Sequence, residues 1–189
     1  MERKAKGVET EPAAQLLARI LAERRKKWEA AQLKKYADAG KAPPKGWQSK
    51  YREPAAPDIS GLRELPEGWV WMTVEQLSEF VRYGSSAKTS EDIDGVPVLR
   101  MGNIQGGELD LDQLKYLPRD HDEFPELLLK KGDLLFNRTN SAELVGKCAV
   151  YEGVPEVCSY ASYLIGVRFP PGCDSRFIAM FINSVLGRA

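Results

Sequence analysis

The sequence is poor in the side chains on which most enzyme chemistry depends. It holds one histidine and three cysteines in 189 residues. Cys148, Cys158 and Cys173 are odd in number and show no Cys-x-x-Cys spacing, which favours reduced, structural thiols in a cytoplasm. No phosphate-binding P-loop, dinucleotide-binding glycine motif or nucleophile elbow occurs. We therefore expect that the chain catalyses nothing by itself.

Long hydrophobic runs and a net charge are also absent. The longest uncharged segments, 157–167 and 177–187, have 11 residues each, whereas a membrane-spanning helix needs about 20. The first residues lead into no apolar stretch, so no secretory signal is predicted. Basic and acidic residues number 27 each, which argues against binding nucleic acid by bulk positive charge. We expect a soluble, cytoplasmic protein without a membrane partner.

The zero net charge is the sum of unequal segments. Residues 1–60 hold 14 basic and 8 acidic side chains, residues 61–136 hold 8 and 15, and residues 137–189 hold 5 and 4. The first segment is therefore basic and the second acidic. The four basic residues at 24–27 are more typical of a solvated helix face than of a phosphate-binding site, although both interpretations stay open.

The basic segment has the pattern of one long helix, which we expect over 11–39 with Thr10 as its N-cap. Its 29 residues would form a rod of roughly 44 Å, more than a domain of this size supports along its length. Leu17, Leu21 and Trp28 recur at helical spacing and form an apolar stripe. We expect this stripe to pack against a partner helix.

A proline-rich, extended linker over 41–64 separates this helical arm (1–40) from a globular domain expected over 65–189. The domain pattern predicts a capping box at Thr73 that opens a helix through Val81. Asp174 is expected to cap a final helix that turns four apolar side chains toward a core. The expected fold class is therefore mixed α/β (α+β). The expected strands cover 69–72, 96–101, 114–117, 134–136, 147–151 and 160–168, and the four apolar side chains are Phe177, Ile178, Phe181 and Ile182.

Polar side chains suited to recognising bases cluster in two predicted loops. Arg100 and Asn103 lie beside a glycine-rich turn, and Arg138 heads an Arg-Thr-Asn-Ser run directly after a predicted strand. Arg and Asn carry the forked donors and acceptors that match guanine and adenine edges. The structural alternative is that the asparagines cap turns and that Arg138 pairs with Asp133 or Glu143.

Acidic side chains around the one histidine offer a further hypothesis. A nuclease could use Asp120, Asp122, Glu123 and Asp133 to hold a divalent ion near His121. A hydrated loop is the simpler interpretation, because neither a second histidine nor a matching cysteine is present to complete a metal site. We expect no metal in this chain.

Several segments resemble, in order along the chain, the specificity subunits of type I restriction–modification systems. The most specific of them is 129–141 (LKKGDLLFNRTNS). The others are 11–20 (EPAAQLLARI), 64–71 (ELPEGWVW), 98–105 (VLRMGNIQ), 144–147 (LVGK), 161–165 (ASYLI) and 181–184 (FINS).

The resemblance implies a non-catalytic subunit that recognises double-stranded DNA. Family members carry two target-recognition domains, each for one half of a bipartite site, separated by paired helices that set the spacing. They direct modification subunits, which use S-adenosylmethionine, and restriction subunits, which use ATP and Mg. These cofactors are therefore expected in partner subunits and not in this chain.

The sequence departs from the family in holding one recognition domain and no second long helix. We therefore expect a half-length subunit or a fragment truncated at its C-terminus, which could pair with a second copy or a second half-subunit. The alternative function is a DNA-inactive fragment that acts only through helix-mediated protein interaction.

The residues expected to contact DNA lie in the loops that the resemblance and the polar clusters share. Arg82 is a further candidate for a phosphate contact. The full set is Tyr83, Ser85, Ser86, Lys88, Arg100, Asn103, Arg138, Asn140, Ser141 and Lys147.

Overall fold

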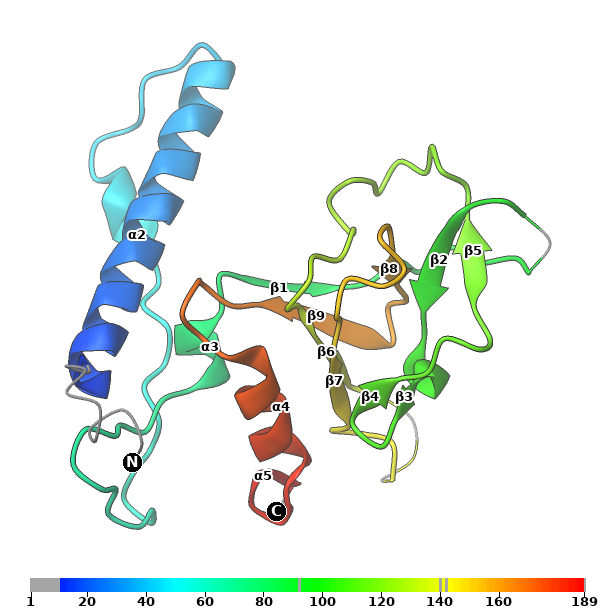
Figure 1. The fold of residues 1–189 in the computed structure, drawn as a ribbon. Helices are drawn as coiled ribbons and strands as arrows, with labels where there is room; N and C mark the ends of the chain where they lie inside the picture. The colour runs from blue at the N-terminus through cyan, green and yellow to red at the C-terminus, as the bar shows by residue number, and fades with distance from the viewer. Residues whose placement is uncertain (1–10, 92, 140, 142, 189) are drawn as a thin grey trace. The chain divides into compact units, whose positions relative to one another are not determined.

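The computed structural model describes residues 11–91, 93–139, 141 and 143–188 (Figure 1). It has a mixed α/β fold with several small sheets, as predicted. The chain divides into two compact units, Met1–Leu77 (unit 1) and Ser78–Ala189 (unit 2). The boundary lies later than the expected one at residue 65, so the proline-rich segment is part of unit 1.

Helix α2 of unit 1 spans Ala13–Asp38. It begins two residues later than predicted, because Pro12 occupies the N-cap position and its carbonyl accepts the first backbone bonds. Glu11 therefore lies before the helix, where its carboxylate pairs with Arg19 at 2.8 Å. The expected N-cap, Thr10, lies outside the described residues.

The proline-rich segment turns back and runs alongside α2 (Figure 1). It contains a 3₁₀ turn, η1 (Trp47–Lys50). The Trp47 ring stacks on Trp28 of α2 with 5.8 Å between centroids, and Tyr51 lies 5.3 Å from the same ring. Trp28 therefore has ring partners in the chain's own return segment, and its contact with a partner helix stays a prediction. Leu17 and Leu21 stay half-buried.

Helix α3 (Val74–Leu77) closes unit 1. The predicted capping box is confirmed: the Gln76 amide N–H donates to Thr73 Oγ1 at 3.1 Å, and the Gln76 side chain accepts from the Thr73 N–H at 3.0 Å. The helix stops at Leu77 and not at Val81, because the next residues enter a sheet. The strand predicted over 69–72 is wrong, since that segment is irregular.

The main sheet of unit 2 has four antiparallel strands in the order β1-β9-β6-β7. Each outer strand pairs with one neighbour, and β9 and β6 form the centre. The strands are β1 (Phe80–Tyr83), β9 (Leu164–Arg168), β6 (Leu134–Asn137) and β7 (Cys148–Val150).

A second sheet has the order β5-β2-β8, and a small hairpin joins β3 to β4. The single strand predicted over 160–168 is two strands in different sheets. A turn at 161–163 separates them, because the Ala161 N–H donates to Leu99 while its carbonyl accepts from Leu164. The elements are β2 (Val96–Leu99), η2 (Met101–Asn103), β3 (Ile104–Gln105), β4 (Glu108–Leu109), β5 (Lys115–Leu117) and β8 (Ser159–Tyr160).

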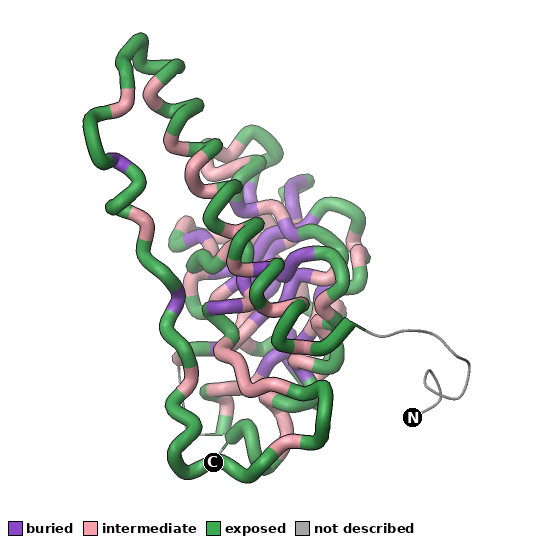
Figure 2. Tube along the Cα trace, turned by 90° about the vertical axis from the view of Figure 1, so that its left-hand side faces the viewer, coloured by how far each residue is buried: buried purple, intermediate pink, exposed green. Residues whose placement is uncertain are grey.

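The core of unit 2 lies between these sheets. Figure 2 shows buried residues gathered in the strands, whereas α2 is mostly exposed or half-buried. Leu99, Leu135 and Leu164 belong to one cluster and are fully buried. Tyr160 joins them with its ring against Gly166, where a Cβ would lie 2.5 Å from the Tyr160 oxygen. Burial of this cluster is the main source of stability of the unit.

Helix α4 (Ser175–Asn183) follows β9, and α5 (Val185–Arg188) ends the described chain. The predicted cap is confirmed, since the Asp174 carboxylate accepts from the amides of Arg176 and Phe177. Of the four side chains expected in the core, Ile178 and Ile182 are half-buried, but Phe177 and Phe181 are 56% and 44% exposed. One side of a short helix contacts β7, and these two rings lie on the other.

Two buried thiols are expected to make the free energy of unfolding of unit 2 depend on pH in alkaline solution. Burial raises the pKa of Cys148 from 9.0 to about 11 and that of Cys158 to about 12. The thiols of the unfolded chain have lower pKa values and lose their protons at lower pH. The contribution of the thiols to the free energy of unfolding is therefore complete below about pH 9 and is lost as the pH rises through their pKa values in the folded chain. We expect the free energy of unfolding, measured by urea titration, to fall between pH 8 and pH 11.

The control for this experiment is the double variant Cys148→Ala/Cys158→Ala, which lacks both thiols. Its unfolding free energy should fall less than that of the native chain over the same range. Equal declines in the two proteins would contradict the assignment to the thiols.

Candidate nucleic-acid interface

Polar side chains gather at one end of the main sheet. Strands β1 and β6 run toward this end, and β7 and β9 begin there: Tyr83 pairs with Ile165, Asn137 pairs with Leu164, and the Asn137 N–H donates to the Lys147 carbonyl at 2.8 Å. Residues at these strand ends are therefore neighbours in space. We call Tyr83, Arg138, Lys147 and Tyr163 the polar edge.

Arg138 is held in position by three contacts. Its guanidinium carbon lies 4.5 Å from the centroid of the Tyr83 ring. Its Nε donates to the Ser162 carbonyl at 3.1 Å, and its backbone N–H donates to the Tyr163 carbonyl at 3.3 Å. The residue is exposed, and its two terminal nitrogens have no partner among the described residues. The Arg138 guanidinium is therefore held in one orientation, while its terminal nitrogens can donate hydrogen bonds to a ligand.

The loop after Arg138 is anchored by Asn137. This side chain is 1% exposed, donates to the Leu144 carbonyl at 2.9 Å and accepts from the Thr139 N–H at 3.4 Å. Asn137 therefore has the turn-capping role that the structural alternative gives to the asparagines. Pairing of Arg138 with Asp133 is not found, because Asp133 lies at the opposite end of β6 and bonds to Arg168.

Two residues of the predicted DNA-contacting set are buried and bonded inside unit 2. Ser85 is 3% exposed; its hydroxyl donates to the Glu123 carboxylate and accepts from the Ala87 N–H. Asn103 is 4% exposed; it accepts from the Arg100 N–H and donates to the Asp110 carbonyl, both at 2.8 Å. Both side chains hold loops of unit 2 in place, and neither is part of the candidate DNA-binding site.

The other predicted residues differ in position. Ser86, Lys88 and Ser141 are exposed, and Lys147 is half-buried at the polar edge. Arg100 follows β2 of the second sheet, where its Nη2 donates to the Gln113 carbonyl at 3.1 Å. Asn140 lies outside the described residues. Arg82 is exposed on β1, with its guanidinium 5.1 Å from the Phe80 ring.

Sequence reasoning missed Tyr163 as a site residue. It is 49% exposed and lies in the turn between β8 and β9. The signal was a break in the single strand predicted over 160–168. Tyr163 of the Ser-Tyr pair is exposed there, whereas Ala161 and Leu164 on either side of the pair are buried. Because the turn also supplies both carbonyls that hold Arg138, it belongs to the same site.

The acidic segment around His121 does not form the proposed metal centre. Asp133 is bound by Arg168, away from this segment. The His121 Nδ1 accepts from the Glu123 N–H and lies 3.4 Å from an oxygen of Asp122. Among the described residues, no three histidine, cysteine or acidic side chains are grouped so that they could hold a metal ion.

Comparison with known proteins identifies relatives of this chain. No family model matches it. Over 108 residues it is 33% identical to the putative type I restriction enzyme MjaX specificity subunit of Methanocaldococcus jannaschii, a match to 57% of this chain and 25% of that protein. Over 119 residues it is 29% identical to the type I restriction enzyme EcoKI specificity subunit of Escherichia coli, covering 62% and 26%. Its curated homologues are type I restriction enzyme specificity subunits.

The chain spans about a quarter of the length of these specificity subunits. The StySPI specificity subunit of Salmonella potsdam is similarly related, with 25% identity over 126 residues. A chain from a structure of the complex assembly and conformational transition of the type I R-M system aligns with a TM-score of 0.46 and 14% identity, over 90% of this chain and 37% of that one. No helix in the described part of the chain is long and apolar enough to cross a membrane.

Proposed function

We propose that this chain is the DNA-recognition part of a type I specificity subunit. It binds one half of a bipartite site in double-stranded DNA and directs modification and restriction subunits to that site. Two observations support the proposal: the relationship to type I specificity subunits, and the polar edge. The observation that carries it is Arg138, whose guanidinium is fixed by an aromatic ring and a carbonyl while its terminal nitrogens stay available.

The geometry of Arg138 suits recognition of guanine. A guanidinium can donate two parallel hydrogen bonds to O6 and N7 of guanine in the major groove. The Tyr83 ring and the Ser162 carbonyl restrict its rotamers before DNA arrives, so less conformational entropy is lost on binding. Tyr163, exposed beside it, offers a flat apolar surface and a hydroxyl to the same groove.

Neighbouring side chains suit contacts with the phosphate backbone. Lys147 lies at the polar edge, Lys88 and Ser86 are exposed on the loop after β1, and Ser141 is exposed after Arg138. Contacts of this type fix the position and orientation of a protein on the duplex and carry no sequence information. In our proposal they position the domain and Arg138 supplies specificity.

Chemistry in this proposal belongs to the partners. Modification subunits would bind S-adenosylmethionine and methylate the recognised site, and restriction subunits would use ATP and Mg to cleave DNA. This chain would select the DNA site at which the partner subunits act. A second copy, or another half-subunit, would read the other half of a bipartite site.

The proposal is tested by selecting bound sequences from a random duplex library. The full chain, assembled with type I modification subunits, is expected to enrich one half-site. Arg138→Ala should relax one base position of that half-site and weaken binding by about 1–3 kcal/mol, because a bidentate contact of this kind contributes that much discrimination.

The matched control is Arg176→Ala. Arg176 is also exposed but pairs with Glu152 at the opposite end of the main sheet, at 2.7 Å, so its loss should leave the enriched sequence unchanged. An unaltered half-site and affinity in Arg138→Ala would remove Arg138 from the interface. Enrichment of no sequence by the native assembly would overturn the proposed function.

A further inference from the structure

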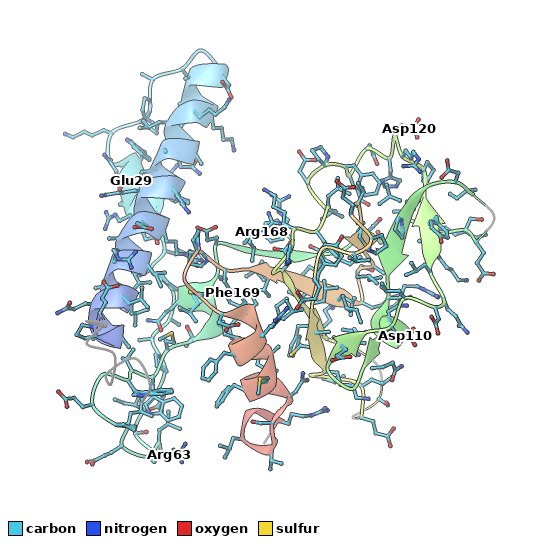
Figure 3. The ribbon with its side chains drawn as sticks, in the orientation of Figure 1. Glu29, Arg63, Asp110, Asp120, Arg168 and Phe169 are labelled. Carbon is cyan, nitrogen blue, oxygen red and sulfur yellow. The ribbon has the colours of Figure 1, made fainter. Side chains whose placement is uncertain are left out.

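Positive charge is concentrated in one part of unit 1. Residues 24–52, which we call the basic hairpin, carry ten Lys or Arg and two Asp or Glu, although the whole chain is neutral. The hairpin comprises the second half of α2 and the return segment with η1 (Figure 3, where Glu29 of α2 is labelled). We infer that it is a second DNA-binding surface, which holds the phosphate backbone of double-stranded DNA whatever its sequence.

The basic hairpin is a folded element and not a flexible tail. Four aromatic rings clamp the return segment to α2: Trp47 stacks on Trp28 at 5.8 Å and meets Tyr36 edge-on at 6.5 Å, and Tyr51 lies 5.3 Å from Trp28. Trp47 is buried. Aromatic contacts of this kind fix the two segments against each other, so their cations are presented at set positions.

Part of this charge is neutralised within the protein. Arg25 lies 3.2 Å from Glu29 and 3.6 Å from Glu53, and Lys34 lies 2.6 Å from Asp38. All these pairs are exposed and therefore weak. The exposed cations of the hairpin that have no ion pair among the described residues are Lys26, Lys35, Lys41, Lys45, Lys50 and Arg52.

The type and spacing of the cations favour an extended polyanion. Seven of the ten are lysines, which act as point charges toward phosphate and lack the planar fork of arginine that reads a base edge. The cations of the hairpin's helical part lie within 24–35, which extends about 17 Å, a length over which duplex DNA carries about ten phosphate charges. The contacts are therefore expected to be independent of sequence and strongly dependent on salt.

The basic hairpin and the polar edge belong to different units of the chain. The polar edge belongs to unit 2 and is proposed to select a sequence through Arg138. The basic hairpin belongs to unit 1 and would add affinity for any duplex. Because sequence-independent binding releases condensed counterions, its signature is the slope of log Kd against log salt concentration.

The test uses the full chain and a random-sequence duplex of about 30 base pairs, with binding followed by fluorescence anisotropy between 50 and 200 mM salt. The triple variant Lys35→Gln/Lys45→Gln/Lys50→Gln removes three exposed charges. If each contacts a phosphate, the salt slope should fall by about 2.7, and binding to every duplex should weaken together. The far-ultraviolet circular dichroism spectrum should not change, because the altered side chains are exposed.

The matched control is Arg119→Gln/Lys130→Gln/Lys131→Gln, which removes three exposed charges from unit 2 and gives the same net charge. Its slope should equal that of the native chain. Equal slopes in the two triple variants would overturn the inference, and so would equally tight binding of the native chain to polyglutamate or to phosphatidylserine vesicles. The library selection with Arg138→Ala is independent of this result, since a shared loss of affinity leaves the enriched sequence intact.

Discussion

Replacing Asp133 by alanine is expected to lower the free energy of unfolding of unit 2 by about 3–5 kcal/mol. The Asp133 carboxylate is 2% exposed and accepts from Arg168 at 2.5 and 2.7 Å and from the Lys130 N–H at 2.8 Å. Its removal leaves the Arg168 guanidinium, with 23% of its side chain exposed, without its counter-ion. Loss of one partner from such a pair costs far more than a surface ion pair contributes.

The expected loss is large because this pair joins two strands and a turn. Asp133 lies immediately before β6, and Arg168, labelled in Figure 3, ends β9; these are the two central strands of the main sheet. The Arg168 guanidinium also lies 5.0 Å from the Phe80 ring of β1. Hydrogen bonds from Arg168 to the carboxylate raise the pKa of the guanidinium, so this contact favours the charged form of Arg168.

Urea denaturation followed by circular dichroism measures this change. Glu152→Ala is the control: it removes the partner of Arg176 from an exposed pair with a distance of 2.7 Å, so we expect a loss below about 1 kcal/mol. Comparable losses in the two variants would show that the buried pair contributes no more than a surface one.

The sequence indicates the elements around this pair but not the pair itself. Two lysines and a glycine before Asp133 predict a turn, and the apolar run after it predicts the strand that is now β6. Nothing local distinguishes Arg168 from other arginines as the partner. It lies 35 positions along the chain, and a single sequence carries no record of contacts at that distance.

The same limit explains the errors in secondary structure. Apolar residues at 69–72 have the composition of a strand but find no neighbour to pair with, whereas 80–83 pair with β9 and leave the expected helix. The capping box at Thr73 and the cap at Asp174 are confirmed because their hydrogen bonds close within a few residues. Trp28 shows the converse case, since its ring partner lies in a segment that was expected to be a plain linker.

For the candidate site, the residue types could be predicted from the sequence, whereas their grouping depends on the fold. Tyr83 and Arg138 were both predicted, but only the antiparallel order β1-β9-β6 places the ring under the guanidinium. The same fold removes Ser85 and Asn103 from the candidate site, because their side chains form hydrogen bonds with carboxylate and backbone groups inside unit 2. Buried polar residues and binding residues look alike in sequence, and burial separates them.

Replacing Gly84 by alanine is expected to damage stability and DNA binding together. A Cβ at this position would lie 2.1 Å from the Tyr160 carbonyl oxygen and 2.6 Å from the Ala161 carbonyl carbon. Both are backbone atoms of the second sheet and its turn, so neither can move as a side chain would. We expect the free energy of unfolding to fall by about 3 kcal/mol, the upper part of the range for overpacked sites.

The substitution should also disturb the polar edge, because Gly84 lies between two residues that support it. The Tyr83 ring contacts Arg138, and the Ser85 backbone is hydrogen-bonded to the segment 160–162. The Ser85 N–H donates to Tyr160 at 2.9 Å and the Ser85 carbonyl accepts from Ser162 at 2.8 Å. Pushing these segments apart separates the Tyr83 ring from the Ser162 carbonyl, which together hold Arg138. Below its melting temperature, Gly84→Ala should therefore recognise its half-site less selectively than the native chain.

A second glycine allows a clean comparison. A Cβ at Gly102 would meet nothing within 4 Å, and its φ lies outside the left-handed range, so Gly102→Ala should fold and select DNA as the native chain does. Urea denaturation and the random-library selection, applied to both variants, separate the two effects. Native-like stability with native-like selectivity in Gly84→Ala would show that the contact between β1 and the turn at 161–163 does not set the position of Arg138.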